Sequence, residues 1–197
     1  MKVRNQIKLT AIIMSCLLIL VSCSEKPIFE GEYEWELQEF SAVNQDNEKV
    51  SRDDLIGEAW LANFVFTQCT TVCQPMTANM AKLQQKLNEE KVKFNIISFS
   101  VDPERDKPEI LKEYGDRYEA DYSTWNFLTG YSEDEIKMIA KNFKTLAERE
   151  EGTDQFIHST KIFLINGEGK IVKGYNGIDV PYDEIINDMK SLNKALF

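Results

Sequence analysis

FTQCTTVCQPMT, residues 66–77, begins at the last residue of the apolar run WLANFVF at residues 60–66. The apolar run has the length expected of a buried strand. Beyond Pro75, apolar residues recur at steps of four, three and four, which is the period of an amphipathic helix: Met76, Met80, Leu83 and Leu87. Proline is accepted in the first turn of a helix. The stretch therefore predicts a strand that runs into a helix, with Cys69 and Cys73 between the two.

Strands and helices alternate along the rest of the chain. We expect strands at 94–101 and 125–128, helices at 107–119 and from Ser132, a late hairpin at 161–175 and a closing helix from Pro181. Ser132 has Glu135 three residues on, which matches a capping box. In the helix at 107–119, the side chains predicted to face inward are Ile110, Leu111 and Tyr114.

Two further segments are predicted to lie at the surface. Residues 32–50 alternate between apolar and acidic side chains in the manner of an exposed β-hairpin, with its turn at residues 44–47. Residues 147–156 are charged, and we expect them to be exposed.

This order of elements predicts one α/β domain at residues 32–197. A central mixed sheet flanked by helices, preceded by an N-terminal β-hairpin, is the arrangement of a thioredoxin-like fold. In that fold, a cysteine pair at the carboxyl end of the first central strand also opens a helix. The unpaired amides and the partial positive charge of a helix amino terminus favour a thiolate over a thiol, so this position activates sulfur as a nucleophile and as a ligand.

The first 31 residues are predicted to be a targeting segment. Residues 1–22 join a basic head to an apolar run, Leu9 to Val21, that is too short to span a bilayer comfortably. Leu20-Val21-Ser22-Cys23 resembles the bacterial lipobox, which predicts a lipoprotein signal peptide at 1–22 and lipidation of Cys23. Residues 23–31 then form a lipid-anchored tether. An uncleaved signal anchor is the alternative interpretation.

The cysteine content and the net charge limit which sites and partners the folded domain can have. If Cys16 leaves with the signal and Cys23 takes the lipid, the folded domain keeps only Cys69 and Cys73. Residues 1–22 hold three of the 23 basic residues and none of the 33 acidic ones, which leaves a formal charge of −13 on the rest. An acidic surface repels nucleic acid, which we therefore do not expect as a partner, and it accepts cations or basic protein faces. Acidity that serves solubility alone fits equally well.

Three kinds of site begin with two nearby sulfurs: a disulfide cross-link, a redox couple and a soft-metal site. A disulfide between Cys69 and Cys73 would close very little chain, so it would add little stability. At positions i and i+4 of a helix, β-carbons lie about 5–6 Å apart, whereas a disulfide wants about 3.5–4.5 Å. A metal is the easier fit, although the loop can still bend to close the bond.

His158 is the single histidine of the chain, and it stands just before the predicted strand at 161–165. Thioredoxins usually have a cis-proline at that position beside the cysteines, but this chain has no proline between Pro108 and Pro181. We therefore expect the imidazole to approach the two sulfurs. Two thiolates and one imidazole suit copper or zinc. Asp102, at the end of another strand, is either a turn residue or a carboxylate that orders a ligand from an outer position.

Three motifs in this order resemble the Sco (SenC) family of copper-binding proteins, which assist the assembly of cytochrome c oxidase. They are FTxCxxxC at 66–73, SVDPERD at 100–106, and His158-Ser159 followed by a strand. The resemblance runs from the hairpin to the closing helix. The chain departs from the commonest pattern at Thr70-Thr71, where many members have Pro-Asp, and at Gln74, where proline is frequent. These changes spare the donor atoms and bear on the stiffness of the loop.

The resemblance implies that Cys69, Cys73 and His158 ligate copper, as Cu(I) or Cu(II), with Asp102 as an outer-sphere residue. It implies a membrane-anchored copper metallochaperone, held by lipid on the outer face of the bacterial plasma membrane. Such a protein would deliver copper by ligand exchange to cytochrome c oxidase subunit II. Oxidation of the two cysteines to a disulfide would abolish binding, so redox state and metal binding are coupled. Met76 and Met80 have helical spacing, which favours core packing over a methionine copper path.

An enzymatic function is the main alternative. A thiol-disulfide reductase that keeps the copper-ligand cysteines of the oxidase reduced would use Cys69 and Cys73 as its redox-active pair. A copper- or redox-sensing module is a third class. A peroxiredoxin fits less well, because the Pro-x-x-x-Thr-x-x-Cys approach to the cysteine is missing.

Overall fold

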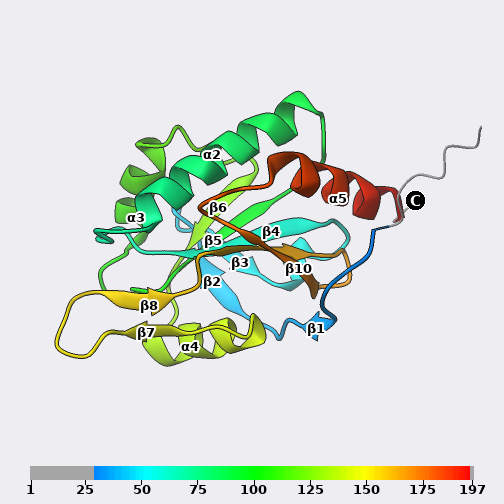
Figure 1. The fold of residues 1–197 in the computed structure, drawn as a ribbon. Helices are drawn as coiled ribbons and strands as arrows, with labels where there is room; N and C mark the ends of the chain where they lie inside the picture. The colour runs from blue at the N-terminus through cyan, green and yellow to red at the C-terminus, as the bar shows by residue number, and fades with distance from the viewer. Residues whose placement is uncertain (1–28, 196–197) are drawn as a thin grey trace, which may run out of the picture.

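A six-stranded sheet forms the centre of the molecule, with the strand order β1-β10-β9-β4-β5-β6 (Figure 1). The computed structural model describes residues 29–195, so the predicted signal peptide and Cys23 lie outside the described residues. The strands of the sheet are β1 (Trp35–Glu36), β4 (Trp60–Val65), β5 (Ile96–Ser100), β6 (Trp125–Leu128), β9 (Lys161–Ile165) and β10 (Lys170–Asn176).

Strand directions bring three distant parts of the chain to one edge. β4, β5 and β6 are parallel neighbours, so their carboxyl ends share an edge of the sheet. β9 runs antiparallel to β4, and its first residues therefore lie at that same edge. β10 pairs with β9 and β1 with β10, both antiparallel, which confirms the predicted mixed sheet. The segments after β4 and β5 thus meet the segment that precedes β9.

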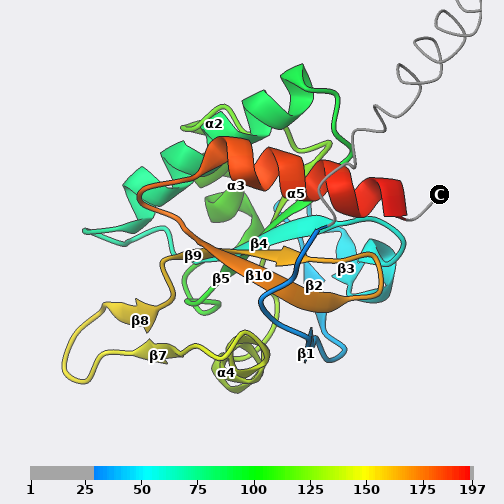
Figure 2. The ribbon, with the colours of Figure 1, turned by 45° about the vertical axis from the view of Figure 1, so that its right-hand side comes forward.

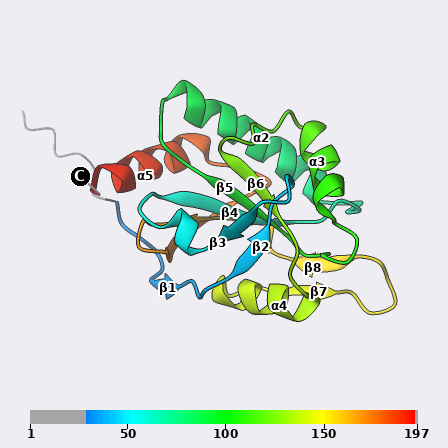
Figure 3. The ribbon, with the colours of Figure 1, turned by 180° about the vertical axis from the view of Figure 1, so that it is seen from behind.

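Helices cover both faces of the sheet (Figures 1 and 3). One face carries α2 (Cys73–Glu89), α3 (Pro108–Asp116) and α5 (Tyr182–Ala195), and the other carries α4 (Glu133–Asn142). β4 is buried along its whole length and serves both cores: Trp60, Ala62 and Phe64 face the α4 side, and Leu61 and Val65 the α2 side. Within residues 29–195, no helix has both the length and the apolar character needed to cross a membrane.

The helices confirm most of the sequence predictions, with shifted ends. α2 begins at Cys73, which places Pro75 in its first turn, and the capping box of Ser132 and Glu135 is present. In α3, Leu111 is buried, but Ile110 is 37% exposed, so its predicted inward position is wrong. Neighbouring residues on a helix point about 100° apart, so Ile110 points away from the face on which Leu111 is buried.

The predicted hairpin at 32–50 is partly wrong. Its turn is confirmed, since residues 44–48 join β2 (Ser41–Val43) to β3 (Lys49–Ser51), and a 3₁₀ helix, η2 (Asp53–Leu55), follows. The earlier arm, however, is β1, which pairs with β10 of the main sheet. The β2–β3 hairpin lies against β6, where Val43 and Thr129 form a β-bridge and the Phe127 amide donates to Gln45 Oε1 at 2.9 Å.

The charged segment at 147–156 forms a second small hairpin, which sequence reasoning missed. Its arms are β7 (Ala147–Arg149) and β8 (Phe156–His158), and its tip at 150–154 is exposed as predicted. Phe156 and Ala147 are buried against the α4 side of the core. The β7–β8 hairpin extends from the body of the molecule and belongs to a separate two-stranded sheet (Figure 2).

Candidate metal centre

The loop that carries Cys69 is held at its start by hydrogen bonds to a buried carboxylate. Thr67, two residues after the end of β4, donates its backbone amide to both carboxylate oxygens of Asp106, at 3.2 and 3.3 Å, and its hydroxyl to Asp106 at 2.6 Å. Ser100 Oγ at the end of β5 donates to the same buried carboxylate at 2.6 Å. Asp106 therefore ties the cysteine loop to the neighbouring strand. Sequence reasoning missed this residue, because an acid shortly before Pro108 looks like any other turn residue.

Cys69 takes the place of a capping residue at the start of α2. The residue before this helix, Val72, has no side chain that can cap it. The backbone amide of Cys73 instead donates to Cys69 Sγ at 3.3 Å. A sulfur that accepts from the first amide of a helix also lies in the positive end of the helix dipole. The strand-to-helix junction thus confirms the sulfur position that the sequence predicted.

The two thiols have opposite ionisation behaviour. Burial opposes ionisation of Cys69, but hydrogen bonds with His158 and with Cys73 outweigh burial and lower its pKa to about 5. Burial, followed by the neighbouring Cys69, raises the pKa of Cys73 well above its ordinary value. In the metal-free protein, Cys69 is thus the thiolate at neutral pH, and Cys73 keeps its proton. A cation that binds both sulfurs must displace the Cys73 proton.

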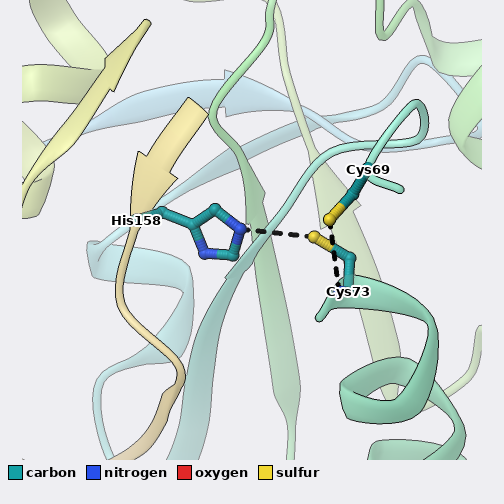
Figure 4. Close-up of side chains that lie close together, drawn as sticks. All are labelled: Cys69, Cys73 and His158. Carbon is teal, nitrogen blue, oxygen red and sulfur yellow. Dashed lines mark hydrogen bonds between the residues drawn. The ribbon is translucent and has the colours of Figure 1, made fainter. Parts of the chain in front are cut away.

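His158 completes the group from the end of β8. Its Nε2 lies 3.2 Å from Cys73 Sγ, as Figure 4 shows. Nδ1 lies 2.9 Å from the carbonyl oxygen of Ser159, which can only accept a hydrogen bond. Nδ1 therefore carries a proton, and Nε2 faces the sulfurs. A proton on Nε2 can be donated to the Cys69 thiolate, which is the hydrogen bond that lowers the pKa of Cys69, and without that proton the Nε2 lone pair is free for a metal ion. The Phe66 ring meets the imidazole edge to face at a centroid distance of 5.8 Å and limits its rotation.

The donor atoms of Cys69, Cys73 and His158 all lie within 4.8 Å of one another. Both cysteines are free and buried, and His158 is half-buried. Two thiol sulfurs and an imidazole nitrogen at this separation fit a soft or borderline metal ion such as copper, since each can reach a common centre with small rotations of its side chain. The predicted meeting of the three residues is thus present in the structure.

Asp102 occupies a different position from these donors. Its side chain is fully buried, and it forms an ion pair with Arg105 Nε. Arg149 Nη2 approaches its other oxygen at 3.8 Å. Within residues 29–195, no hydrogen bond joins Asp102 to Cys69, Cys73 or His158. The hydrogen-bonding route from this carboxylate toward the cysteine loop runs through Arg105, which also contacts Gln68.

Two other features lie outside the site. Met76 and Met80 are buried in the core, as their helical spacing predicted. A cavity of about 550 Å³ between the β2–β3 hairpin and α4 is lined by residues such as Phe40, Tyr131 and Met138, and it includes none of the three donors.

The fold and the site together define a class: a thioredoxin-like protein in which a cysteine pair and a late histidine form a potential soft-metal site. The SCO1/SenC family model matches residues 32–194. The chain therefore belongs to the SCO1/SenC family, as its three motifs predicted. The SCO1 protein homolog of Bacillus subtilis is 47% identical over 176 residues, which cover 88% of this chain and 91% of that protein.

Solved structures of the family have the same fold. A SCO1/SenC family lipoprotein from Bacillus anthracis is 48% identical, with a TM-score of 0.78 over 81% of this chain and 95% of that one. BsSco, a member of the Sco family of cytochrome c oxidase assembly proteins for which a disulfide switch is described, is 46% identical, with a TM-score of 0.77 over 83% and 98%. Arabidopsis thaliana ScoI, solved with copper bound, is 27% identical, with a TM-score of 0.65 over 78% and 97%.

Proposed function

We propose that this protein is a membrane-anchored copper metallochaperone that serves the copper site of cytochrome c oxidase subunit II. The observation that carries the proposal is the convergence of Cys69, Cys73 and His158 within 4.8 Å. Membership of a family with a copper-bound structure and with oxidase assembly proteins supports it.

The three donors have separate roles in copper binding. Cys69 is already a thiolate at neutral pH, so it provides the first attractive contact for the cation. Cys73 loses its proton as the metal binds, which makes affinity depend on pH. His158 offers the Nε2 lone pair, with its ring held by the Nδ1 hydrogen bond to Ser159.

Redox state controls whether binding is possible. Oxidation of the two thiols by an external oxidant removes two electrons and two protons and forms one sulfur–sulfur bond. The product has no thiolate to offer, so the oxidised protein releases copper. The disulfide switch described for BsSco, which is 46% identical, supports this coupling. Delivery to the oxidase then proceeds by ligand exchange from the reduced, copper-loaded protein.

The place of action follows from the amino-terminal segment. Cleavage after Ser22 and lipidation of Cys23 would hold the domain on the outer face of the plasma membrane, on a tether that ends at residue 31. The related lipoprotein from Bacillus anthracis supports this assignment. Metabolic labelling with a radioactive fatty acid tests it, because label should enter the wild type and be absent from Cys23→Ala.

Anaerobic titration of the reduced protein with copper tests the metal site. We expect one tight equivalent of Cu(I) and, with Cu(II), a thiolate-to-copper charge-transfer band. Both should disappear in the Cys69→Ala, Cys73→Ala double variant. If the reduced wild type gives neither tight Cu(I) binding nor the band, the metallochaperone proposal is wrong.

The reductase alternative is favoured by one observation, the contrast between an ionised Cys69 and a protonated Cys73. This contrast is typical of a dithiol in which one sulfur attacks and the other resolves. His158→Ala separates the two functions. A metallochaperone loses copper affinity and oxidase assembly in this variant, whereas a reductase keeps most of its dithiol activity at a pH above the pKa of Cys69, which is higher without the His158 hydrogen bond.

A further inference from the structure

The histidine of the site comes from a part of the chain that has little support of its own. The arms of the β7–β8 hairpin are three residues each, and they form a two-stranded sheet apart from the central one. An isolated hairpin of this size is marginally stable in water. The position of His158 relative to the sulfurs must therefore depend on contacts between the hairpin and the rest of the molecule.

Arg105 contacts three separate parts of the molecule. Its Nε pairs with the buried carboxylate of Asp102 after β5. Its Nη1 donates to Gln68 Oε1 at 3.3 Å, next to Cys69. Its Nη2 donates to the backbone carbonyl of Asp154, at the hairpin tip, at 2.7 Å. One guanidinium thus joins the scaffold, the cysteine loop and the hairpin.

The geometry suits arginine in particular. The guanidinium is a rigid planar group with five donors, so fixing one edge against Asp102 also fixes the directions of the remaining N–H groups. Asp102 is fully buried and Arg105 is about three-quarters buried, which shields the ion pair from water. The hydrogen bond from Nη2 to Asp154 uses a backbone oxygen, so it fixes the course of the chain at the tip. Nη1 also lies 3.5 Å from the Asp154 carboxylate.

Other contacts also hold the hairpin against the cysteine loop and α4. Gln155 Nε2 donates to the Gln68 carbonyl, and Thr70 Oγ1 donates to Gln155 Oε1, both at 3.5 Å. Arg149 lies on the hairpin itself and pairs with Glu133 at the start of α4, at 3.0 Å. These contacts leave Arg105 as the residue that bridges from a buried anchor to both the sulfur loop and the hairpin tip.

We infer that Arg105 is a positioning residue for copper binding, which holds the β7–β8 hairpin so that His158 reaches the sulfurs. The inference rests on the proposed copper site. It also gives Asp102 a defined role, since the carboxylate orients Arg105 and does not act on the metal. Loss of the guanidinium loosens the tip of the hairpin, while Phe156 and Ala147 still pack in the core at its base. His158 then binds only after its position has been restored.

The test uses the full-length reduced protein in detergent, with Cu(I) itself as the probe, in competition with a chromogenic Cu(I) chelator. Partners that orient a metal ligand are typically worth 10–100-fold in affinity, and we expect Arg105→Ala to weaken Cu(I) binding by about tenfold. Arg105→Lys should recover part of this loss, because lysine keeps the charge but lacks the planar fork. Arg117→Ala is the matched control, since Arg117 is exposed and stacks on Tyr114. It should bind like the wild type.

A double-mutant cycle separates positioning of His158 from general damage. If Arg105 acts through the imidazole, Arg105→Ala should change affinity less than about twofold when His158 is already alanine. The same loss in both backgrounds would mean that Arg105 supports the cysteines or the fold, and the inference would be wrong. Wild-type affinity in His158→Ala would overturn the three-donor site and the inference together. A loss in His158→Ala with none in Arg105→Ala would overturn the inference alone.

Amide hydrogen exchange of the metal-free protein gives a readout that needs no copper. We expect peptides that cover 147–158 to exchange faster in Arg105→Ala, while the peptides of β4 and α2 keep their protection. Unchanged exchange in 147–158 would contradict the inference. Loss of protection throughout the chain would do so too, since it would show a role in global stability.

Discussion

Nε2 of His158 lies 3.2 Å from Sγ of Cys73, although 85 positions separate the two residues along the chain. The antiparallel pairing of β9 with β4 brings them together, because it returns the late chain to the edge where the cysteine loop begins. The chemistry of the site therefore depends on a pairing between early and late strands, and it can be tested at each donor.

Replacement of His158 by alanine should act on both the metal and the thiols. Copper affinity should fall by at least tenfold, as expected for the loss of a ligand that a hydrogen bond holds in place. In the metal-free protein the pKa of Cys69 should rise, because a hydrogen bond with His158 helps to lower it. Chelator competition measures the first effect, and thiol alkylation against pH measures the second. An unchanged Cys69 profile would show that the imidazole does not interact with that sulfur.

The reduced, metal-free protein should show a marked pH dependence of thiol reactivity. The pKa of Cys69 is lowered to about 5, so its alkylation by iodoacetamide should be half-maximal near pH 5 and constant from pH 7 to 8. Cys73, whose pKa is raised by burial, should stay slow over this range. Mass spectrometry of the labelled peptides distinguishes the two cysteines. Equal rates at both sulfurs would contradict the assignment.

The lowered pKa of Cys69 also makes the stability of the fold depend on pH. The folded protein favours the Cys69 thiolate more than the unfolded chain does, because the folded pKa lies below the ordinary value of 9.0. The contribution to the free energy of unfolding is therefore complete above about pH 9 and is lost as the pH falls through about 5. Cys69→Ser should flatten this part of the stability curve, measured by urea unfolding at a series of pH values under reducing conditions.

Asp106→Ala should destabilise the domain by about 2–4 kcal/mol, because it leaves the buried donors of Thr67 and Ser100 without their acceptor. Urea unfolding of the reduced protein measures the loss. Glu113→Ala, an exposed acid on α3, is the control and should change stability by less than about 0.5 kcal/mol. If Asp106→Ala is as stable as the control, the carboxylate does not hold the cysteine loop.

Met80→Leu tests whether a methionine takes part in copper binding. Met80 is buried in the core, and leucine has nearly the same volume, so the free energy of unfolding should change by less than about 1.5 kcal/mol. Copper affinity should stay within about twofold of the wild type in the same chelator competition. A tenfold loss of affinity would place Met80 on a path for the metal.

The sequence predicted the centre of this protein better than its margins. β4 is one apolar run and α2 has a strong helical period, and both bury the residues that these patterns mark as apolar, so local pattern and tertiary structure agree. β1 and β7 are only two and three residues long. For such segments the choice of partner depends on which unpaired strand lies nearby, and this information is not local.

The same distinction applies to the site. Cys69, Cys73 and His158 were predictable because thiols and a lone imidazole are rare in this chain. Asp106 and Arg105 were not, since they are two charged residues among many. Their role depends on distances to Thr67 and to Asp154, segments 39 and 49 positions away.

One margin of the central sheet is a very short strand and the other is covered, and this bears on self-association. At one side, the backbone of Glu32 and Tyr33 donates to the Val172 carbonyl, and β1 continues along β10. At the other, the β2–β3 hairpin shields the outer amides of β6. An unprotected strand invites a second molecule to extend the sheet, the first step toward aggregates. A short edge strand on one side and a covering hairpin on the other leave little room for such an extension.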